Sequence, residues 1–318
     1  MVLSVVRRVG RSLLVILLVT IGVTLLLSLA PGSAAQVVLG PNATPEAVDA
    51  LEARLGLDQP VWSQYGHWLA AGVRGDLGES PVTGQSVSEA IVERLPVTLE
   101  LASLALVLAL VVAVLLATVS AGRPGGPVDR SANALSSVFL SVPAFIAGPV
   151  LIYVFAVQAG WLPVSGWARV GEEGLGAHLR SAALPVVAIA LTEIAAFHRL
   201  LRSDLVGTLR EDFVEAARAK GLGRGHVMFR HALRPSSFSL VTLAGLSLGR
   251  LIGGTVVVES LFGLPGLGQL MASAITQRDV VMVQGVVVFV AVVYVLVNML
   301  VDLSYQFIDP RVRRAARA

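Results

Sequence analysis

The sequence predicts an all-helical protein that is embedded in a membrane. Of its 318 residues, 55% are hydrophobic and only 14% are charged, whereas charged residues make up about 25% of soluble globular domains. The mean hydropathy is +0.78, and the apolar residues gather in runs of about 20, the length that a helix needs to cross a bilayer. A soluble fold could not bury this much apolar surface, so lipid is the expected solvent.

Six segments are long and apolar enough to form transmembrane helices. They lie at roughly 12–30, 97–120, 134–158, 182–201, 238–258 and 283–303. The first one follows Arg7, Arg8 and Arg11, which is also how a signal peptide begins, but its apolar run is long for a signal peptide. We therefore expect it to remain as the first membrane helix.

The distribution of arginine predicts the orientation of these helices, because cytoplasmic loops are enriched in Lys and Arg. With the N-terminus in the cytoplasm, most of the 24 Lys and Arg residues fall in cytoplasmic segments. Arg250 lies within a span, and the basic residues that fall outside are Arg54, Arg74, Arg94, Arg169, Arg180 and Arg278. Both termini are therefore expected in the cytoplasm. The pI of 9.8 reflects this asymmetry, so nucleic acid is not an expected partner.

The long outer segment between the first two spans is expected to form a small folded cap. Within it, 45–57 has the apolar periodicity of an amphipathic helix, with Thr44 as a start signal and Gly56 as a stop signal. The chain is thus expected to consist of two parts. An N-terminal helix with its outer segment occupies 1–96, and a five-helix core occupies 97–318.

A short helix is predicted in the longest cytoplasmic loop, over 212–221. Asp212 and Glu215 have the spacing of a capping box, in which each side chain binds a backbone N–H of the first turn. Gly221 suits the left-handed conformation that commonly ends a helix. A charged, capped helix outside the membrane is suited to docking on another molecule in the cytoplasm.

One face of this helix is expected to carry the docking contact. Phe213, Ala216, Ala217 and Lys220 recur at the spacing of a single helical face. The alanines would let a partner's backbone approach closely, and burial of the Phe213 ring would stabilise the contact by about 1.5–3 kcal/mol. The alternative is a helix that lies on lipid headgroups, but one aromatic residue among alanines makes a weak lipid anchor. Docking on a protein is therefore favoured.

Glu215-Ala216-Ala217 followed by Gly221 resembles the EAA motif of permeases from bacterial ABC importers. More narrowly, the chain resembles the first, B-type permease subunit of the dipeptide, oligopeptide and nickel importers over nearly its whole length. The other stretches that carry the resemblance are Leu55-Gly-Leu-Asp-Gln-Pro60, Gly75-Asp-Leu-Gly78, Glu93-Arg-Leu-Pro-Val-Thr-Leu-Glu100, Trp161-Leu-Pro163, Ala217-Arg-Ala-Lys-Gly221, His231-Ala-Leu-Arg234, Pro265-Gly-Leu-Gly268 and Asp309-Pro-Arg311. This ordered series is far more specific than the EAA-like piece alone.

The resemblance implies a six-helix transmembrane bundle of the type I ABC-importer permease kind, in the inner (plasma) membrane of a bacterium. A folded extracytoplasmic segment would lie between helices 1 and 2. The implied partners are a homologous second permease, two cytoplasmic ABC ATPases, a substrate-binding protein outside the membrane, and membrane lipid. ATP and Mg²⁺ would bind to the ATPases, whose closure would switch the permease between inward-open and outward-open states.

The cytoplasmic loop at about 210–225 would then hold the coupling helix, which sits in a groove of one ATPase. The residues that the resemblance assigns to this contact are Asp212, Phe213, Glu215, Ala216, Ala217, Lys220 and Gly221. Short peptides are the substrate that the resemblance favours, and nickel or a metallophore complex is the alternative within the same family. The alternative from another class is a self-sufficient secondary carrier or channel. No internal repeat is visible, so the inverted-repeat plan of many carriers has no support.

Two charged residues fall inside predicted spans, where charge is costly and usually faces the bundle interior or a cavity. Glu193 lies nine residues after Leu184, and Arg250 lies nine residues before Glu259, so each is about 14 Å inward from the outer side. Because these depths agree, we expect the two residues to form an ion pair. Such a pair would either line the translocation pathway or be sealed inside the fold, and the sequence leaves both open.

The outer segment 259–281 is rich in turn-forming residues and is expected to be a non-helical turn. By resemblance it would form an outer lid over the pathway, with Glu259, Pro265, Gly266 and Asp279 as its marked residues. A plain surface loop is the alternative.

The sequence lacks the motifs of catalysis and of bound cofactors. There is no G-x-x-x-x-G-K-[ST] motif for phosphate binding and no cysteine, and the five histidines do not have the spacing of metal ligands. The chain is therefore expected to be a non-catalytic translocation subunit that holds no metal or cofactor of its own.

Overall fold

The computed structural model describes residues 2–29, 34–40 and 42–308, and it describes side chains for 10–29, 34–40 and 42–301. Within these ranges every regular element is a helix, apart from one isolated antiparallel bridge between Glu79 and Ser86. The elements are α1 (Val2–Leu29), α2 (Ala34–Leu39), α3 (Pro45–Leu55), α4 (Val61–Gly72), α5 (Val87–Ala121), α6 (Pro127–Ser141), α7 (Ala144–Leu151), the π-helix η1 (Ile152–Gln158), α8 (Val170–Thr208), α9 (Asp212–Ala219), α10 (Arg224–His226), the π-helix η2 (Val227–Ala232), α11 (Leu233–Gly254), α12 (Val256–Phe262), α13 (Leu267–Thr276) and α14 (Val280–Ile308).

Five stretches of the described chain are long and apolar enough to cross a membrane, or up to seven if each of two bent helix pairs is one span. The five stretches are Gly10–Leu29 of α1, Val87–Ala121, Val170–Thr208, the continuous run Arg224–Gly254, and Val280–Val301 of α14. They overlap five of the six spans expected from the sequence, and each is longer at one end or both because the helices extend beyond their apolar centres.

The sixth expected span, 134–158, differs from the prediction because it is not one straight helix. Helices α6 and α7–η1 meet there at an angle of 103°. Val142 has extended backbone angles (φ −106°, ψ 106°) and Pro143 follows it. Proline lacks a backbone N–H and disfavours helical geometry in the residue before it, so the helix breaks at this position.

The outer stretch 259–281 also differs from the prediction of a non-helical turn. It consists mainly of two helices, α12 and α13. The non-helical residues are the link between them, 263–266, and the short stretch 277–279 before α14. Gly263 starts the link in the left-handed conformation (φ 64°). The turn-forming residues therefore mark a short link between helices rather than a long loop.

The described chain divides into two compact units. The first comprises Met1–Thr98 and Pro265–Val295, and the second comprises Leu99–Leu264 and Leu296–Ala318. The first unit thus joins the N-terminal part expected from the sequence to a segment from near the C-terminus. Helices α5 and α14 each contribute residues to both units.

In the first unit, α1 and the segment α2–α4 are joined by buried polar contacts. The hydroxyl groups of Thr20 and Tyr65 lie 2.7 Å apart.

Helix α3 has the predicted ends: the Thr44 hydroxyl accepts from the Ala47 N–H at 3.3 Å, and Gly56 is left-handed at φ 67°. These two predictions are confirmed.

The core of the first unit depends on a close approach of α14 to α5. Its buried residues are Val87, Ala90, Ile91, Leu267, Leu270, Ala274, Met282, Val283 and Val286. A Cβ atom added at Gly285 would lie 2.3 Å from Cγ1 of Val87, which no van der Waals contact allows. Glycine is therefore required at position 285 for these helices to pack.

We expect Gly285→Ala to destabilise the protein by about 1–3 kcal/mol, because the added methyl group overpacks a tight contact. Combining it with Val87→Ala should recover part of that loss, since the smaller side chain makes room. Thermal unfolding of the purified protein measures both effects. Gly22→Ala is the matched control: a Cβ atom there meets nothing within 4 Å, so no loss is expected. Equal unfolding temperatures for Gly285→Ala and the wild type would contradict the packing argument.

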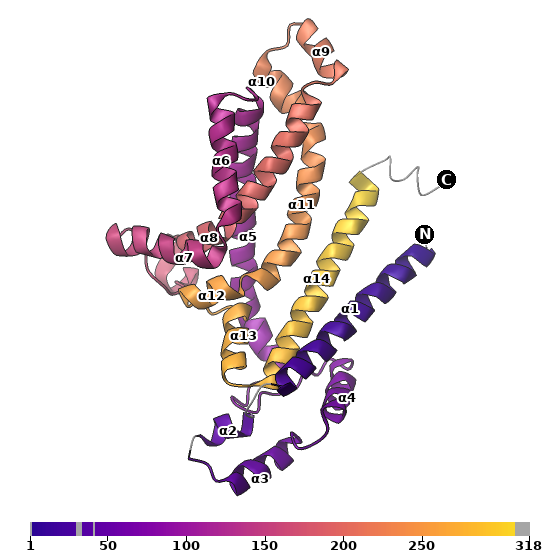
Figure 1. Ribbon diagram of the computed structural model, residues 1–318, viewed down its shortest axis with the longest axis vertical. Coiled ribbons are helices and arrows are strands. Elements are labelled where there is room, and N and C mark those ends of the chain that lie inside the picture. The colour runs from indigo at the N-terminus through magenta and orange to yellow at the C-terminus, as the bar shows by residue number, and fades with distance from the viewer. Residues whose placement is uncertain (1, 30–33, 41, 309–318) are drawn as a thin grey trace. The chain divides into compact units, whose positions relative to one another are not determined.

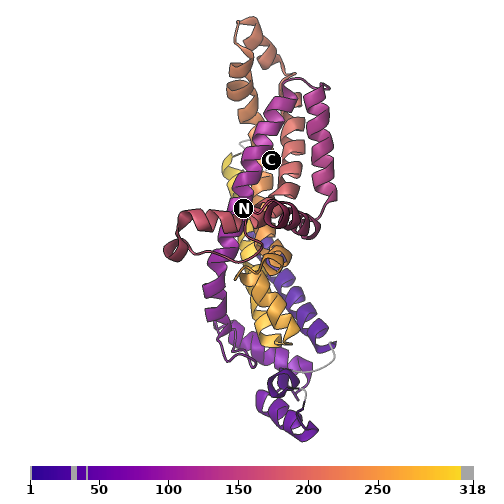
Figure 2. The same ribbon diagram turned by 90° about the vertical axis from the view of Figure 1, so that its left-hand side faces the viewer.

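In the second unit, α8 is the central helix. Residues on most of its circumference are buried, and α6, α7 and α11 pack against it (Figures 1 and 2). Helix α9 follows α8 after a three-residue link and stands at one end of this unit (Figure 1). The unit therefore carries both the predicted cytoplasmic helix and the predicted intramembrane charges.

Candidate functional site

Helix α9 begins one residue earlier than the capping-box prediction requires. Its N-cap is Glu211, in extended conformation, and no side chain caps the helix. Instead, the carbonyl oxygen of Glu211 accepts from the N–H groups of Val214 at 2.9 Å and Glu215 at 3.2 Å. The predicted capping box between Asp212 and Glu215 is therefore wrong. Both carboxylates lie in the first turn, where they interact favourably with the helix dipole.

The two faces of α9 are differently occupied. Val214 and Ala217 are buried, together with Val227 and the partly buried Leu209. Phe213 has 48% of its surface exposed. Ala216 and Lys220 are also exposed. The predicted face of Phe213, Ala216, Ala217 and Lys220 is thus corrected in one member, because Ala217 faces this chain.

The end of α9 agrees with the prediction from the sequence. Gly221 is left-handed, with φ at 80°, and its N–H donates to the carbonyl of Arg218 at 2.9 Å. The next N–H, that of Leu222, donates back to Ala217 at 3.3 Å. The chain then enters α10, η2 and α11, which run on as one helical stretch. Gly221 is therefore the corner that turns the chain back towards the bundle.

Glu193 and Arg250 lie in contact within the second unit. Nη2 of Arg250 donates to Oε1 of Glu193 at 2.7 Å, and the hydroxyl of Ser247 donates to the other carboxylate oxygen at 2.8 Å. The environments of the two partners differ: the Glu193 side chain is only 5% exposed, whereas the Arg250 side chain is 60% exposed. The guanidinium group therefore binds a buried carboxylate, while most of the Arg250 side chain is not covered by this chain.

The four residues marked in the outer segment fall in different settings. Glu259, in the second unit, is fully buried and accepts from the Thr255 hydroxyl at 2.7 Å. Asp279, in the first unit, is buried as well; it accepts from the Ser80 hydroxyl and from the N–H of Met282 at 3.0 Å. Pro265 and Gly266 belong to the link before α13. Both carboxylates thus bind groups of this chain.

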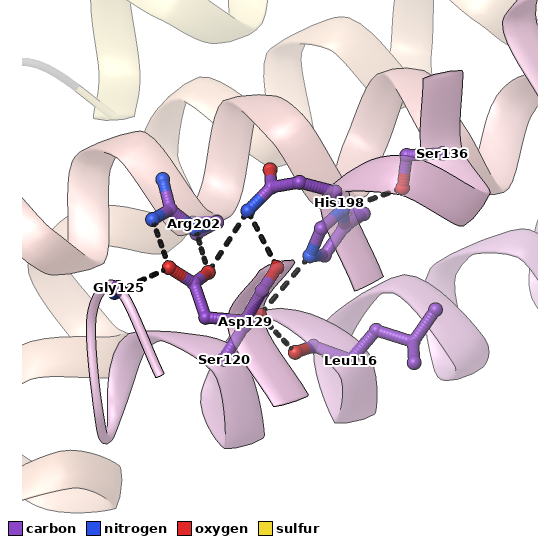
Figure 3. Close-up of polar contacts among 8 residues, drawn as sticks. Leu116, Ser120, Gly125, Asp129, Ser136, His198 and Arg202 are labelled. Atoms are coloured by element: carbon purple, nitrogen blue, oxygen red, sulfur yellow. Dashed lines mark hydrogen bonds and ion pairs between the residues drawn. The ribbon is translucent and has the colours of Figure 1, made fainter. Parts of the chain in front are cut away.

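An ion pair with a buried carboxylate, which the sequence analysis did not identify, lies between α6 and α8. The guanidinium of Arg202 binds both carboxylate oxygens of Asp129, one of them from Nη2 at 2.6 Å (Figure 3). The Gly125 N–H donates to the same carboxylate at 2.7 Å, and the Asn133 amide donates to it at 2.9 Å. Every oxygen of this buried carboxylate therefore has partners.

One turn before Arg202, His198 is completely buried and connects three helices. Its Nε2 atom lies 3.1 Å from the hydroxyl of Ser120 on α5, and its Nδ1 atom lies 2.7 Å from the hydroxyl of Ser136 on α6 (Figure 3). Ser120 donates its own proton to the carbonyl of Leu116. The histidine therefore donates from Nε2 to Ser120, and in a neutral ring Nδ1 then accepts from the hydroxyl of Ser136.

We call these side chains, together with the Gly125 N–H, the polar brace: Ser120, Asp129, Asn133, Ser136, His198 and Arg202. The sequence does contain a signal for it. Asp129, Asn133 and Ser136 recur at i, i+4 and i+7 on one helix, and His198 and Arg202 are spaced i, i+4 on another. Polar residues that share a face in otherwise apolar helices indicate contact between helices in a membrane.

No group of three or more His, Asp or Glu side chains in the described part of the chain is arranged to hold a metal ion. The buried carboxylates of Asp129, Glu193, Glu259 and Asp279 are instead bound to arginine, amide, hydroxyl or backbone groups. The described sites therefore consist of hydrogen bonds and ion pairs within the protein.

The fold is similar to that of a chain of an ABC transporter. A crystal structure of an amino acid ABC transporter with histidines superposes with a TM-score of 0.52 and 18% identity, over 69% of this chain and 94% of that chain. The sequence identifies the family. The model of the binding-protein-dependent transport system inner membrane component matches 110–314, and the model of its N-terminal region matches 1–102. The chain belongs to this family, so it is a non-catalytic permease component of the inner membrane.

Several relatives match nearly the full length. A probable peptide ABC transporter permease of Sinorhizobium fredii is 38% identical over 96% of this chain and 98% of its own. A putative peptide transport system permease of Brucella abortus is 39% identical with the same coverage. The dipeptide transport system permease DppB of Alkalihalophilus pseudofirmus is 33% identical over 95% of this chain and 98% of its own. The family resemblance that the sequence suggested is confirmed.

Proposed function

We propose that this chain is the B-type permease subunit of an ATP-driven importer of short peptides. It would form the translocation pathway with a homologous permease, take substrate from an extracytoplasmic binding protein, and be driven by two cytoplasmic ABC ATPases that carry ATP and Mg²⁺. The relatives named for peptides and dipeptides support this substrate class, since they match the chain from end to end. A nickel or metallophore importer is the alternative within the family, and none of these three relatives carries such a name.

The observation that carries the mechanism is the two-sided packing of α9. Its inner face, Val214 and Ala217, is anchored on this chain, while Phe213 remains exposed beside Ala216. An exposed aromatic ring next to a small residue suits insertion into a groove of another protein. We therefore assign the ATPase contact to Phe213, Ala216 and Lys220, with Gly221 ending the helix and Asp212 and Glu215 charging its first turn.

The count of membrane crossings supports the orientation that arginine predicted. If α6–α7 is one crossing and α12–α13 is a re-entrant pair, the spans are α1, α5, α6–α7, α8, α11 and α14. An even number of crossings then separates α9 from the N-terminus, and six separate the two termini. Residues 1 and 309–318 lie outside the described residues. We propose that both termini and α9 are cytoplasmic and that α2–α4 form the extracytoplasmic segment.

We propose that the Glu193–Arg250 pair lines the translocation pathway. The Arg250 side chain is 60% exposed. Contact of its charged group with lipid tails would be costly, so within a span it faces water or another protein. The homologous permease and the pathway between the two subunits satisfy this requirement. The other option left by the sequence was a pair sealed inside the fold. The burial of Glu193 agrees with that option, but the exposure of Arg250 does not.

The α12–α13 segment is proposed as an outer lid, with Pro265 and Gly266 in its link. Glu259 and Asp279 would act as anchors at the two ends of the segment rather than as substrate contacts. Their burial supports this assignment, since both carboxylates already bind groups of their own unit.

Uptake into proteoliposomes tests the proposal. The complex with its partner permease, ATPases and binding protein should accumulate radiolabelled alanylalanine only when ATP is supplied on the ATPase side. Radioactive Ni²⁺ should not accumulate. Accumulation of the dipeptide without ATP would indicate a secondary carrier, and accumulation of Ni²⁺ in its place would favour the nickel alternative.

A further inference from the structure

The polar brace lies on the helix that leads directly into α9. His198 and Arg202 are ten and six residues before Thr208, the last residue of α8, which is about 15 and 9 Å along the helix axis. The link to α9 is only three residues long, and Leu209 within it packs against the buried face of α9. A displacement of α9 is therefore passed first to the inner end of α8.

The brace ties that end of α8 to two other helices. Arg202 and His198 bind Asp129 and Ser136 on α6, and His198 also binds Ser120 in the last turn of α5. The Gly125 N–H fixes the α5–α6 turn to the same carboxylate. Both sets of contacts are directional. Arg202 binds Asp129 through two hydrogen bonds, and His198 is bound through both of its ring nitrogens.

The setting of these contacts makes sliding between the helices costly. Asp129, Ser136 and His198 are buried, whereas the opposite face of α6 exposes Val128, Leu135 and Val138. The polar groups thus face the interior and the apolar groups face outwards, as expected of a helix in lipid. Shifting α8 along α6 would separate these buried polar groups from their partners, which is costly for groups that are shielded from water.

We propose that the polar brace joins α5, α6 and α8 into one lever, and that Asp129, His198 and Arg202 are positioning residues that convert ATPase closure into movement of the bundle. The inference rests on the proposed function, because it requires α9 to be the ATPase contact. Without the brace, α8 would bend or slide locally when α9 is pushed. ATP would then be hydrolysed without a full change of access.

The first test compares transport with ATP consumption in the reconstituted complex. Arg202→Lys keeps the charge but loses the two-point geometry, and Asp129→Asn keeps the shape but loses the charge. We expect alanylalanine uptake per ATP hydrolysed to fall by about ten-fold in each variant, while ATP hydrolysis continues. Arg199→Lys, at an exposed position of the same helix, is the matched control and should couple normally.

The second test measures rigidity directly, and its first arm leaves every residue of the brace unchanged. The chain has no cysteine, so cysteines placed at Leu135 on α6 and Ser203 on α8, both exposed, can carry spin labels without background from this chain. In the otherwise unaltered protein, the distance between the labels should be the same without nucleotide and with ATP trapped. In the Asp129→Asn background, it should broaden or shift on ATP binding.

The outcomes separate this inference from the function on which it rests. Wild-type complex that neither binds ATPases through α9 nor transports with ATP would overturn the proposed function. A wild-type complex that transports normally, but in which the α6–α8 distance changes with nucleotide, would overturn the lever alone. Normal coupling in both Arg202→Lys and Asp129→Asn would overturn it too.

Discussion

Phe213→Asp is expected to abolish ATP-driven uptake while leaving the permease folded. The ring is exposed in the isolated chain and lies on the face of α9 that does not pack on its own bundle. Loss of its burial in an ATPase groove would cost about 1.5–3 kcal/mol, which weakens docking by about ten- to a hundred-fold. The new carboxylate adds a desolvation cost in the same groove, so docking should fall below detection.

The measurement is co-purification of the ATPases with the permease, followed by uptake of alanylalanine in proteoliposomes. Phe213→Tyr is the matched control, since it keeps the ring and adds only a hydroxyl, and it should retain docking. Val214→Asp makes a contrasting variant: its site is completely buried in this chain, so it should unfold the α9 region as well. Undiminished uptake by Phe213→Asp would remove α9 from the mechanism.

The second large effect concerns the Glu193–Arg250 pair, and it is expected to be asymmetric. Arg250→Met leaves a carboxylate buried without its cation, a change that costs about 3–5 kcal/mol in known buried pairs. Glu193→Gln leaves instead a guanidinium that is mostly exposed and can be solvated, so it should cost less. The double variant should be closer to wild type than Arg250→Met alone, because it removes the stranded charge.

Thermal unfolding of the purified complex and ATP-driven uptake would both be measured for the four proteins of this cycle. Contacting residues typically show interaction energies of about 0.5–3 kcal/mol. Strictly additive losses would show that the two side chains do not interact. Arg250→Lys serves as the charge-preserving control. If Arg250 lines the pathway, this variant should change uptake more than it changes the unfolding temperature.

Several features of the fold could be predicted from the sequence because they depend on local chemistry. The apolar runs identify helices such as α1 and α14, and the ends of α3 follow from Thr44 and Gly56. Gly221 ends α9 for the same reason. Glu193 and Arg250 were paired by depth alone, since charge inside a span requires a partner.

Other features depended on tertiary contacts, which decide between several conformations that the local sequence allows. The α9 capping box did not form because the backbone carbonyl of Glu211 already satisfies the first-turn N–H groups. Ala217 turned inwards because Val227, from a later segment, covers it. The break at Pro143 lies within an apolar run whose composition favoured one continuous span. Sequence periodicity gives the faces of a helix but not what covers each face.

The polar brace was missed for a related reason. Its residues come from three separate helices, and each resembles an ordinary surface position when its own segment is considered alone. On α6, the repeated spacing of Asp129, Asn133 and Ser136 distinguishes these residues, but it does not show which residues they contact. His198 and Arg202 complete the set from about 60–70 residues further along the chain.

Helix α6 has its polar side chains on the buried face and its apolar side chains on the exposed face. This reverses the usual pattern, in which apolar positions tolerate substitution least. Val128, Leu135 and Val138 would be ranked as core by hydrophobicity alone, yet they are exposed and should accept exchange among aliphatic residues. Asp129 and Ser136 would be ranked as surface, yet they are buried and hydrogen-bonded. A scoring scheme trained on water-soluble proteins would therefore misjudge harmful and harmless variants of this helix in opposite directions.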